Sequence, residues 1–305
     1  MKHTLPMTIL GRTGLNVTRL GFGAMEIRGS RIWNGRAVND NQAETILNAV
    51  LDAGINFIDT AGCYGHSEEY IGKFISQRRS DYYLATKCGC SIVRKDETVD
   101  DTPHFYTKEN AFQCLQNSLQ RMKTDYVDIM QLHNPSVEQC EKGGLVDALN
   151  EMKRQGKVRW ISVSTTLPHL PVFLKWGVFD TFQIPYSALE REHENWITKS
   201  AEAGIGTIIR GGVALGEPGI GRGAQNRWKL FEDAKLDELR EEGESRTSFM
   251  LRFTLSHPHV DTIIVGTLIP EHLQENLNAV VQGPLSARIY KEAKSRLNKA
   301  GEKPK

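Results

Sequence analysis

Four residues whose side chains can hold or move a proton follow apolar runs in the first half of the chain. Asp59, Lys87 and His133 each close a run with the pattern of a buried strand, and Tyr64 stands just beyond the first of these runs. Taken singly, such residues are more often a helix cap, a solvated lysine, a core histidine or a packed tyrosine. If the runs are neighbouring strands of one parallel barrel, their carboxyl ends meet at one face and the four groups converge there.

This combination suits the proton transfer that accompanies reduction of a carbonyl by hydride. The carbonyl oxygen needs a proton, and a tyrosine, with an ordinary pKa of about 10, donates poorly near neutrality unless its surroundings tune it. A nearby ammonium favours the phenolate. We therefore expect Lys87 to tune Tyr64, Asp59 to hold Lys87 in its charged form, and His133 to donate a hydrogen bond that orients the substrate oxygen.

The elements that would position these groups alternate between strands and helices. After a short hairpin over residues 7–19, strands are predicted at 20–24, 56–61, 82–87, 127–133, 158–165, 181–187, 206–210 and 262–267. Helices are predicted at 41–53, 67–77, 108–123, 145–155, 168–176, 195–203, 246–256 and 270–281. Apolar strands spaced by helices indicate a parallel sheet covered on both faces. Eight such pairs favour a (β/α)₈ TIM barrel.

The main alternative fold is a doubly wound nucleotide-binding sheet. No Gly-x-Gly-x-x-Gly lies between a predicted strand and helix, which counts against it. We predict one barrel domain over residues 1–285, followed by a C-terminal helix and charged, frayed tail at 286–305. The polar connection 88–107 and the glycine-rich stretch 211–228 interrupt the repeat, and long loops in compact domains are usually functional or disordered.

Composition excludes several classes of protein. The formal net charge is +1 and no basic stripe is visible, so no nucleic-acid partner is expected. No apolar run reaches the roughly 18 residues that would span a bilayer, and Met1 to Pro6 lacks the apolar core of a secretory signal. Five cysteines do not form a disulfide scaffold, and an odd number suits a reducing compartment. We expect a cytoplasmic protein that is a monomer or a small homo-oligomer.

Three segments together resemble the signature of the aldo-keto reductases. They are Asp59-Thr60-Ala61-Gly62-Cys63-Tyr64-Gly65, Leu84-Ala85-Thr86-Lys87, and Asp128 to Pro135 with His133, in the order expected for that family. The resemblance extends over nearly the whole chain. It implies a (β/α)₈ barrel that transfers hydride between NAD(P)H and an aldehyde or ketone, or the reverse. It also implies that Tyr64 is the acid–base group, with Lys87, Asp59 and His133 in the supporting roles.

The same resemblance implies where the cofactor lies. Its positions here are Gly23, Ala24, Met25, Asp59, Ser164, Thr165, Gln183, Arg210, Gly211, Gly212, Val213, Ala214, Gly216, Gly266, Thr267, Leu268, His272, Glu275 and Asn276. Thr165 stands where the family usually has asparagine, and Arg210 stands where an aromatic residue often stacks on the nicotinamide. A guanidinium plane can also stack on a ring.

The sequence does not decide between NADP and NAD as the cofactor. Many members of the family hold the 2′-phosphate of NADP with Lys, Arg or Ser, whereas this chain has Gly266, Leu268 and His272 at such places. Phosphate is held best by arginine or by a helix N-terminus. NADP(H) is the family default, and use of NAD(H) is the competing hypothesis.

The substrate pocket and the cysteines are less well determined. Trp33 and Phe105, with Tyr64 and His133, are the candidates for contact with a small carbonyl or alcohol substrate. Cys63 and Cys88 are expected near the active site as ordinary structural thiols. No metal is predicted, because the cysteines lack a C-x₂-C pair.

Two other classes of function compete with a reductase. One is a non-catalytic barrel that binds nicotinamide and regulates a protein partner. Two features are compatible with this alternative: the long polar segment 88–107, and the lack of Lys, Arg or Ser where the family often holds the 2′-phosphate. The other is a metal-dependent hydrolase, for which His133 and Asp59 are too few ligands.

Overall fold

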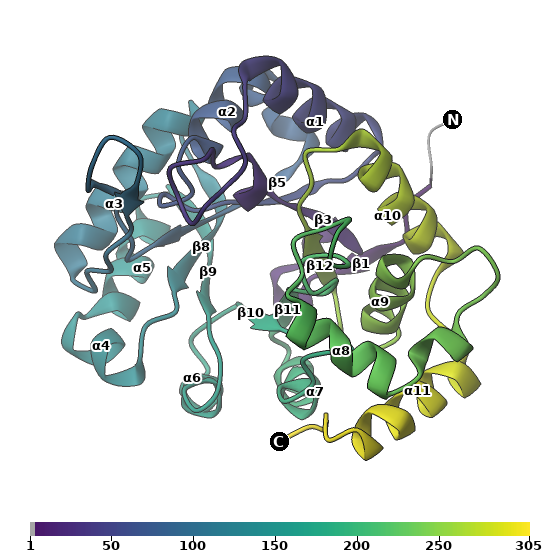
Figure 1. Cartoon of the computed structure of the whole chain (residues 1–305). Helices are drawn as coiled ribbons and strands as arrows, with labels where there is room; N and C mark the ends of the chain where they lie inside the picture. The colour runs from purple at the N-terminus through teal and green to yellow at the C-terminus, as the bar shows by residue number, and fades with distance from the viewer. Residues whose placement is uncertain (1–3) are drawn as a thin grey trace.

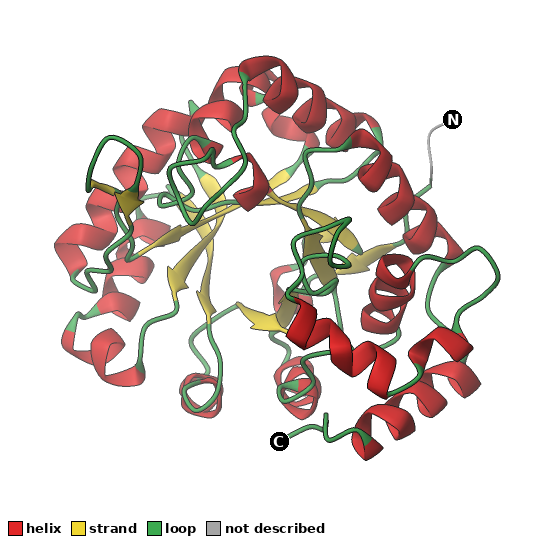
Figure 2. Ribbon diagram, in the orientation of Figure 1, coloured by secondary structure: helices red, strands yellow, loops and turns green. Residues whose placement is uncertain are grey.

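The computed structural model describes residues 4–305 and contains the predicted barrel. Its parallel strands close in the order β10-β11-β12-β3-β4-β5-β8-β9, and helices surround them (Figures 1 and 2). The barrel strands are β3 (Leu20–Gly23), β4 (Phe57–Asp59), β5 (Tyr83–Cys88), β8 (Val127–His133), β9 (Val158–Ser164), β10 (Thr181–Pro185), β11 (Gly206–Arg210) and β12 (Thr262–Val265). Residues 1–3, part of the stretch considered for a secretory signal, lie outside the described range.

The helices match the predicted positions to within a few residues, with two additions. They are α1 (Asp40–Asp52), α2 (Ser67–Phe74), α3 (Lys108–Met122), α4 (Val137–Lys142), α5 (Leu145–Arg154), α6 (Leu170–Trp176), α7 (Glu194–Glu202), α8 (Gln225–Asp233), α9 (Arg246–Leu255), α10 (Pro270–Gln282) and α11 (Ala287–Lys299). Helices α4 and α8 were not predicted. Helix α4 begins with a capping box: the side chain of Ser136 accepts from the backbone amide of Gln139, and the side chain of Gln139 accepts from the backbone amide of Ser136.

A hairpin of β1 (Met7–Ile9) and β2 (Asn16–Thr18) closes the end of the barrel opposite the predicted site. Its residues Leu10 and Val17 pack against Phe57 and other core residues of the strands. At Gly11 the backbone has φ +46°, and an added Cβ would lie 2.1 Å from the amide nitrogen of Gly206, the first residue of β11. Only glycine permits this approach. The carboxyl ends of the strands are left to form the site.

The polar segment after β5 is ordered by pairing within itself and with the loop after β3. It contains the two-residue strands β6 (Val93–Arg94) and β7 (Asp100–Asp101), which pair antiparallel. The guanidinium of Arg31 donates to both carboxylate oxygens of Asp100, at 2.6 and 2.9 Å. This bidentate ion pair links the two loops beside the mouth of the barrel.

The C-terminal helix packs on the barrel, and the tail after it is held rather than frayed. Ala293 and Leu297 of α11 are buried. Arg191, which is buried, donates to the side chain of Asn298 at 2.8 Å and to the carbonyl of Glu302 at 3.0 Å. The ammonium of Lys305 lies 2.7 Å from the Glu192 carboxylate. Among residues 4–305, no helix combines the length and apolar character needed to cross a membrane.

Candidate active site

The register of the strands brings the predicted catalytic residues together at the carboxyl end of the barrel. Asp59 pairs with Gly23, Lys87 pairs with Gln131, and His133 pairs with Ser164. A cavity of about 570 Å³ opens above them, and Asp59, Tyr64 and His133 line it. Four residues that are distant in sequence therefore occupy one site, as the barrel hypothesis predicts.

Lys87 is completely buried beneath the cavity and is paired with Asp59. Its Nζ donates to Asp59 Oδ2 at 2.6 Å and to the carbonyl of Thr60 at 2.8 Å. The other oxygen of Asp59 accepts from the amides of Gln131, at 2.6 Å, and Gln183, at 2.8 Å. Both oxygens of the buried carboxylate are thus satisfied, which fixes its orientation toward the lysine.

The electrostatics of this site keep Lys87 charged. Burial lowers the pKa of its ammonium, but the charge of Asp59, the proximity of Tyr64 and their hydrogen bonds outweigh burial, and the net pKa is raised. Lys87 Nζ lies 4.8 Å from the centroid of the Tyr64 ring. The arrangement places a permanent positive charge beside the phenol, which is the condition for stabilising a phenolate.

His133 faces Tyr64 across the cavity floor and is uncharged. The two ring centroids lie 5.9 Å apart at an interplanar angle of 82°. Burial, followed by the charge of Lys87, lowers the pKa of His133 well below its ordinary value. A neutral imidazole has one N–H donor and one acceptor nitrogen. One of its nitrogens is therefore suited to donate a hydrogen bond to an oxygen bound between the two rings.

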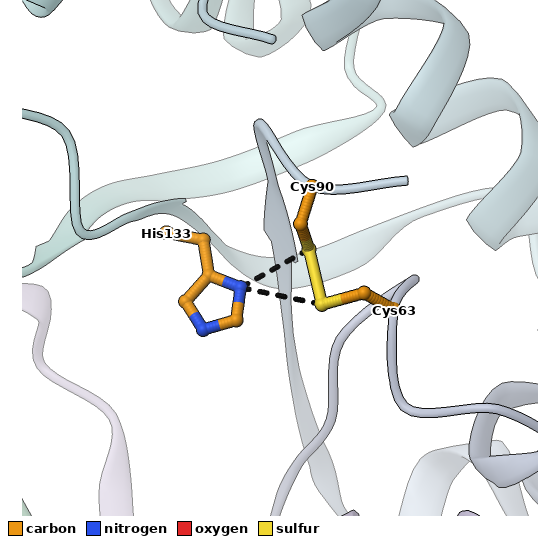
Figure 3. A group of neighbouring side chains, drawn as sticks. All are labelled: Cys63, Cys90 and His133. Carbon is orange, nitrogen blue, oxygen red and sulfur yellow. Dashed lines mark hydrogen bonds between the residues drawn. A yellow bond between two sulfur atoms is a disulfide. The ribbon is translucent and has the colours of Figure 1, made fainter. Parts of the chain in front are cut away.

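The cysteine prediction requires a correction. Cys63 and Cys90, rather than Cys63 and Cys88, lie beside the predicted catalytic residue His133, and they form a disulfide with their Cα atoms 5.7 Å apart (Figure 3). Cys88 is a free, buried thiol in the hydrophobic core. Both sulfurs of the disulfide face Nδ1 of His133. This is also a cluster of metal-ligating residue types, but sulfurs bonded to each other are not the thiolates that metal ions require.

Most of the predicted cofactor residues line the cavity. They are Gly23, Met25, Asp59, Ser164, Gln183, Arg210, Gly211, Gly212, Val213, Ala214, Gly216, Gly266, Thr267, His272, Glu275 and Asn276. Three others do not. Ala24 is wholly buried, Thr165 is buried with its amide donating to the carbonyl of Gln183, and Leu268 packs against the hydrophobic core.

The lining residues fit a nicotinamide dinucleotide. Arg210 is partly buried and lines the cavity, and its buried Nε is a donor without a hydrogen-bond partner among residues 4–305. The segment from Gly211 to Gly216 lines the cavity, and backbone amides of such a glycine-rich segment can bind a pyrophosphate. Asn276 and other residues from the first turns of α10 also line it. The cavity is thus bordered both by the predicted catalytic residues and by the start of a helix.

The lining of the cavity includes three of the four residues predicted to contact substrate, Trp33, Tyr64 and His133. Trp33 lines the cavity and meets the edge of Tyr64 at a centroid distance of 5.8 Å. Phe105 is 50% exposed and is not among the lining residues. His104 lines the cavity instead, with its ring centroid 5.3 Å from that of His133. Neighbouring residues in an extended segment point to opposite sides, and the sequence did not show which side faces the site.

Several residues of the site were not predicted. Gln131 lies in the segment that resembles the family signature, and its side-chain amide orients Asp59 by donating to Oδ1. Asn134 follows His133 in a left-handed conformation, with φ +57°, and accepts a hydrogen bond from Ser164 at 2.8 Å. The position of Asn134 directly after a predicted strand was the signal that could have identified it. Other unpredicted lining residues include Glu26, Arg36, Glu190, Arg222 and Arg227.

Comparison with known proteins places this site in a defined family. The model of the aldo/keto reductase family matches residues 19–297. The chain is 30% identical over 290 residues to the uncharacterized oxidoreductase YqkF of Bacillus subtilis, covering 88% of this chain and 89% of that protein. It is 29% identical over 309 residues to the NADH-specific methylglyoxal reductase of Escherichia coli, covering 89% and 92%. The holo structure of aldo-keto reductase AKR11C1 from Bacillus halodurans superposes with a TM-score of 0.83 at 27% identity, covering 96% of each chain.

Proposed function

Because the chain belongs to the aldo/keto reductase family, we propose that it reduces a small aldehyde or ketone with Tyr64 as the acid–base group. The family membership makes the protein an NAD(P)-dependent oxidoreductase, and reduction of carbonyls by NAD(P)H is the general activity of the family. The roles of individual residues, the substrate and the preferred cofactor are the parts that we propose.

The proposed reaction assigns one task to each catalytic group. The nicotinamide, when bound, supplies the hydride. The substrate oxygen lies between Tyr64 and His133, accepts a hydrogen bond from the neutral imidazole, and receives the phenolic proton as the carbonyl is reduced. Lys87 stabilises the phenolate that remains, and Asp59 holds Lys87 in place through the 2.6 Å ion pair. In the reverse direction the phenolate takes the proton from an alcohol.

The observation that carries this proposal is the buried pair of Lys87 and Asp59 beneath Tyr64. Placing two charges where no water reaches them is costly, and a module that only binds nicotinamide has no use for a buried ammonium beside a phenol. The pair therefore favours an enzyme over the alternative of a non-catalytic regulatory subunit.

The test is steady-state turnover of a panel of small aldehydes and ketones by wild type and Tyr64→Phe. We expect the variant to lose about 10²- to 10⁴-fold in kcat, because it lacks the proton donor. Its Kd for the cofactor, measured by fluorescence titration, is expected to stay near the wild-type value. If Tyr64→Phe has the same kcat as wild type, Tyr64 is not the proton donor.

We also propose that the protein accepts NADH as well as NADPH. The lining residues from the β12–α10 region, Gly266, Thr267, His272, Glu275 and Asn276, include no lysine or arginine. The carboxylate of Glu275 already accepts a hydrogen bond from Ser248. The similar protein from Escherichia coli is named as NADH-specific. Comparison of kcat/KM for the two cofactors tests this, and a preference for NADPH above about 10²-fold, equivalent to about 2.7 kcal/mol, would refute it.

A further inference from the structure

The disulfide beside the active site has a contact that the proposed reaction does not use. Nδ1 of His133 lies 3.1 Å from the sulfur of Cys90 and 3.5 Å from that of Cys63 (Figure 3). Both cysteines are buried, and His133 is the group assigned to orient the substrate oxygen. The chemical state of the sulfurs therefore decides what Nδ1 meets.

In the dithiol state, a thiol supplies a hydrogen-bond donor to Nδ1. A cysteine S–H is a weak donor, and at the distance of Cys90 it can donate to the lone pair of Nδ1. The imidazole then carries its single proton on Nε2, because the partner of one ring nitrogen sets the state of the other. This tautomer presents an N–H from Nε2, the nitrogen that does not face the sulfurs.

In the disulfide state, neither sulfur has a proton to donate. The two sulfurs are then only weak acceptors, and the Nδ1–H tautomer is the one they can accommodate. Protonation of both nitrogens does not restore the donor, since burial and the charge of Lys87 hold the pKa of His133 well below its ordinary value. Nε2 then carries a lone pair instead of a proton. It cannot donate a hydrogen bond to a carbonyl oxygen, and the lone pairs of the two atoms repel each other.

We propose that Cys63 and Cys90 are a reversible dithiol–disulfide pair that sets the tautomer of His133 and so switches carbonyl reduction on and off. The inference rests on the proposed role of His133 in orienting the substrate oxygen. The dithiol form is active because Nε2 donates to the substrate, and the disulfide form is impaired because it does not. Cys90, the nearer of the two sulfurs, is a positioning residue.

The oxidant that we assign to this pair is a small peroxide. One thiolate attacks a peroxide oxygen and becomes a sulfenic acid, releasing hydroxide. The second thiol attacks the sulfenic sulfur, the S–S bond forms, and water leaves, so two thiols and hydrogen peroxide give one disulfide and two waters. A dithiol reverses the reaction by exchange. In a reducing compartment a disulfide is usually transient and regulatory, which agrees with a reversible pair.

The experiment compares kcat after treatment with hydrogen peroxide and after dithiothreitol, with a chelator present to exclude trace metal. Free thiols are counted in parallel, and five are expected in the reduced chain and three in the oxidised chain. Loss of one preorganised donor to a reacting oxygen predicts a fall in kcat of about 10²-fold. Dithiothreitol should restore kcat, and the Kd for cofactor should change little. Cys140→Ser, which alters a free cysteine outside this cluster, is the control and should respond as wild type does.

Two double variants separate the tautomer from the cross-link. Cys63→Ala/Cys90→Ser cannot form the disulfide but keeps an O–H that can donate to Nδ1. Cys63→Ala/Cys90→Ala can form neither the disulfide nor that hydrogen bond. We expect both to be insensitive to peroxide and the serine variant to have the higher kcat. Equal kcat in the two variants, or wild-type kcat unaffected by a complete change in thiol count, would overturn the proposal.

The protonated nitrogen of His133 is read directly from ¹⁵N NMR of the imidazole, with His133→Gln identifying the signal. The proton should lie on Nε2 in the reduced protein and on Nδ1 in the oxidised protein. This measurement does not depend on turnover. If the reduced protein reduces no carbonyl but the tautomer still changes, the proposed function has failed and the redox dependence of His133 stands. If the tautomer does not change, the switch is refuted whatever the activity.

Discussion

Replacing Asp59 by asparagine removes the negative partner of a buried lysine while preserving the shape of the site. The amide oxygen of the new side chain can still accept from Gln131 and Gln183, as Asp59 Oδ1 does now at 2.6 and 2.8 Å. Its NH₂ group then faces the Lys87 ammonium, so two donors oppose each other where a 2.6 Å ion pair exists in the wild type. Lys87 keeps the carbonyl of Thr60 as an acceptor and its hydrogen bond with Tyr64, but loses its only carboxylate partner.

The expected cost is large because Lys87 is completely buried. Breaking a buried ion pair by removing one partner typically destabilises a protein by about 3–5 kcal/mol. Deprotonation of Lys87 limits the loss, since burial then acts on its pKa without the opposing charge of Asp59. We expect a loss in the free energy of unfolding of about 3 kcal/mol near pH 7, together with a kcat that falls more than KM rises.

The pH dependence distinguishes this cause from a general packing defect. In the wild type the folded pKa of Lys87 is raised, so its stabilising contribution is present below the unfolded value of about 10.4 and is lost as pH rises through the folded value. In Asp59→Asn the folded pKa falls below the unfolded value. The variant therefore gains stability as pH rises between these two values, and its deficit relative to wild type shrinks.

Urea unfolding at about pH 7 and about pH 9.5 measures both effects. Glu138→Gln is a suitable control, because its partner Lys142 and Glu138 itself are both exposed. Removing such a surface pair should cost less than about 1 kcal/mol at either pH. If Asp59→Asn loses no more stability than this control, or if its deficit is the same at both pH values, the buried-charge account of the site is wrong.

Two further predictions concern other parts of the molecule. Trp33→Ala should raise the KM for aromatic aldehydes, because Trp33 lines the cavity against Tyr64. Phe105→Ala should leave KM unchanged, because Phe105 is exposed and does not line the cavity. Steady-state kinetics measures both, and equal KM values for the two variants would show that the pocket is misassigned. Burial raises the pKa of Asp261 to about 6, above its unfolded value of about 3.9, so its contribution to stability is present below about pH 4 and is lost as pH rises to about 6. Asp261→Asn should remove this dependence, and the stability of wild type relative to the variant should fall across that range in urea titrations; a constant difference would argue against the raised pKa.

The barrel, and the meeting of Asp59, Tyr64, Lys87 and His133 at one end of it, could be predicted from sequence because their signals are local. Each barrel strand is a short apolar run, and the runs alternate with helical patterns, which leaves few possible topologies. Asp59, Lys87 and His133 each end such a run, so the parallel arrangement alone brings them to one face. Helix α4 was missed because its six residues are too short for a periodic pattern, although its capping box was present.

The remaining features of the site depend on distances between segments that are far apart in sequence. The chain alone gives no indication that Gln131 and Gln183 both donate to Asp59, that His104 rather than Phe105 faces the cavity, or that Leu268 turns into the core. Cys63 pairs with Cys90, and not with Cys88, because the loop after β5 folds back toward Cys63. Residue type and order in the chain thus determine which chemical groups reach the carboxyl end of the barrel. Only the packed structure decides which of them touch, because contacts of a few ångströms depend on side-chain direction, burial and loop path, which no local pattern encodes.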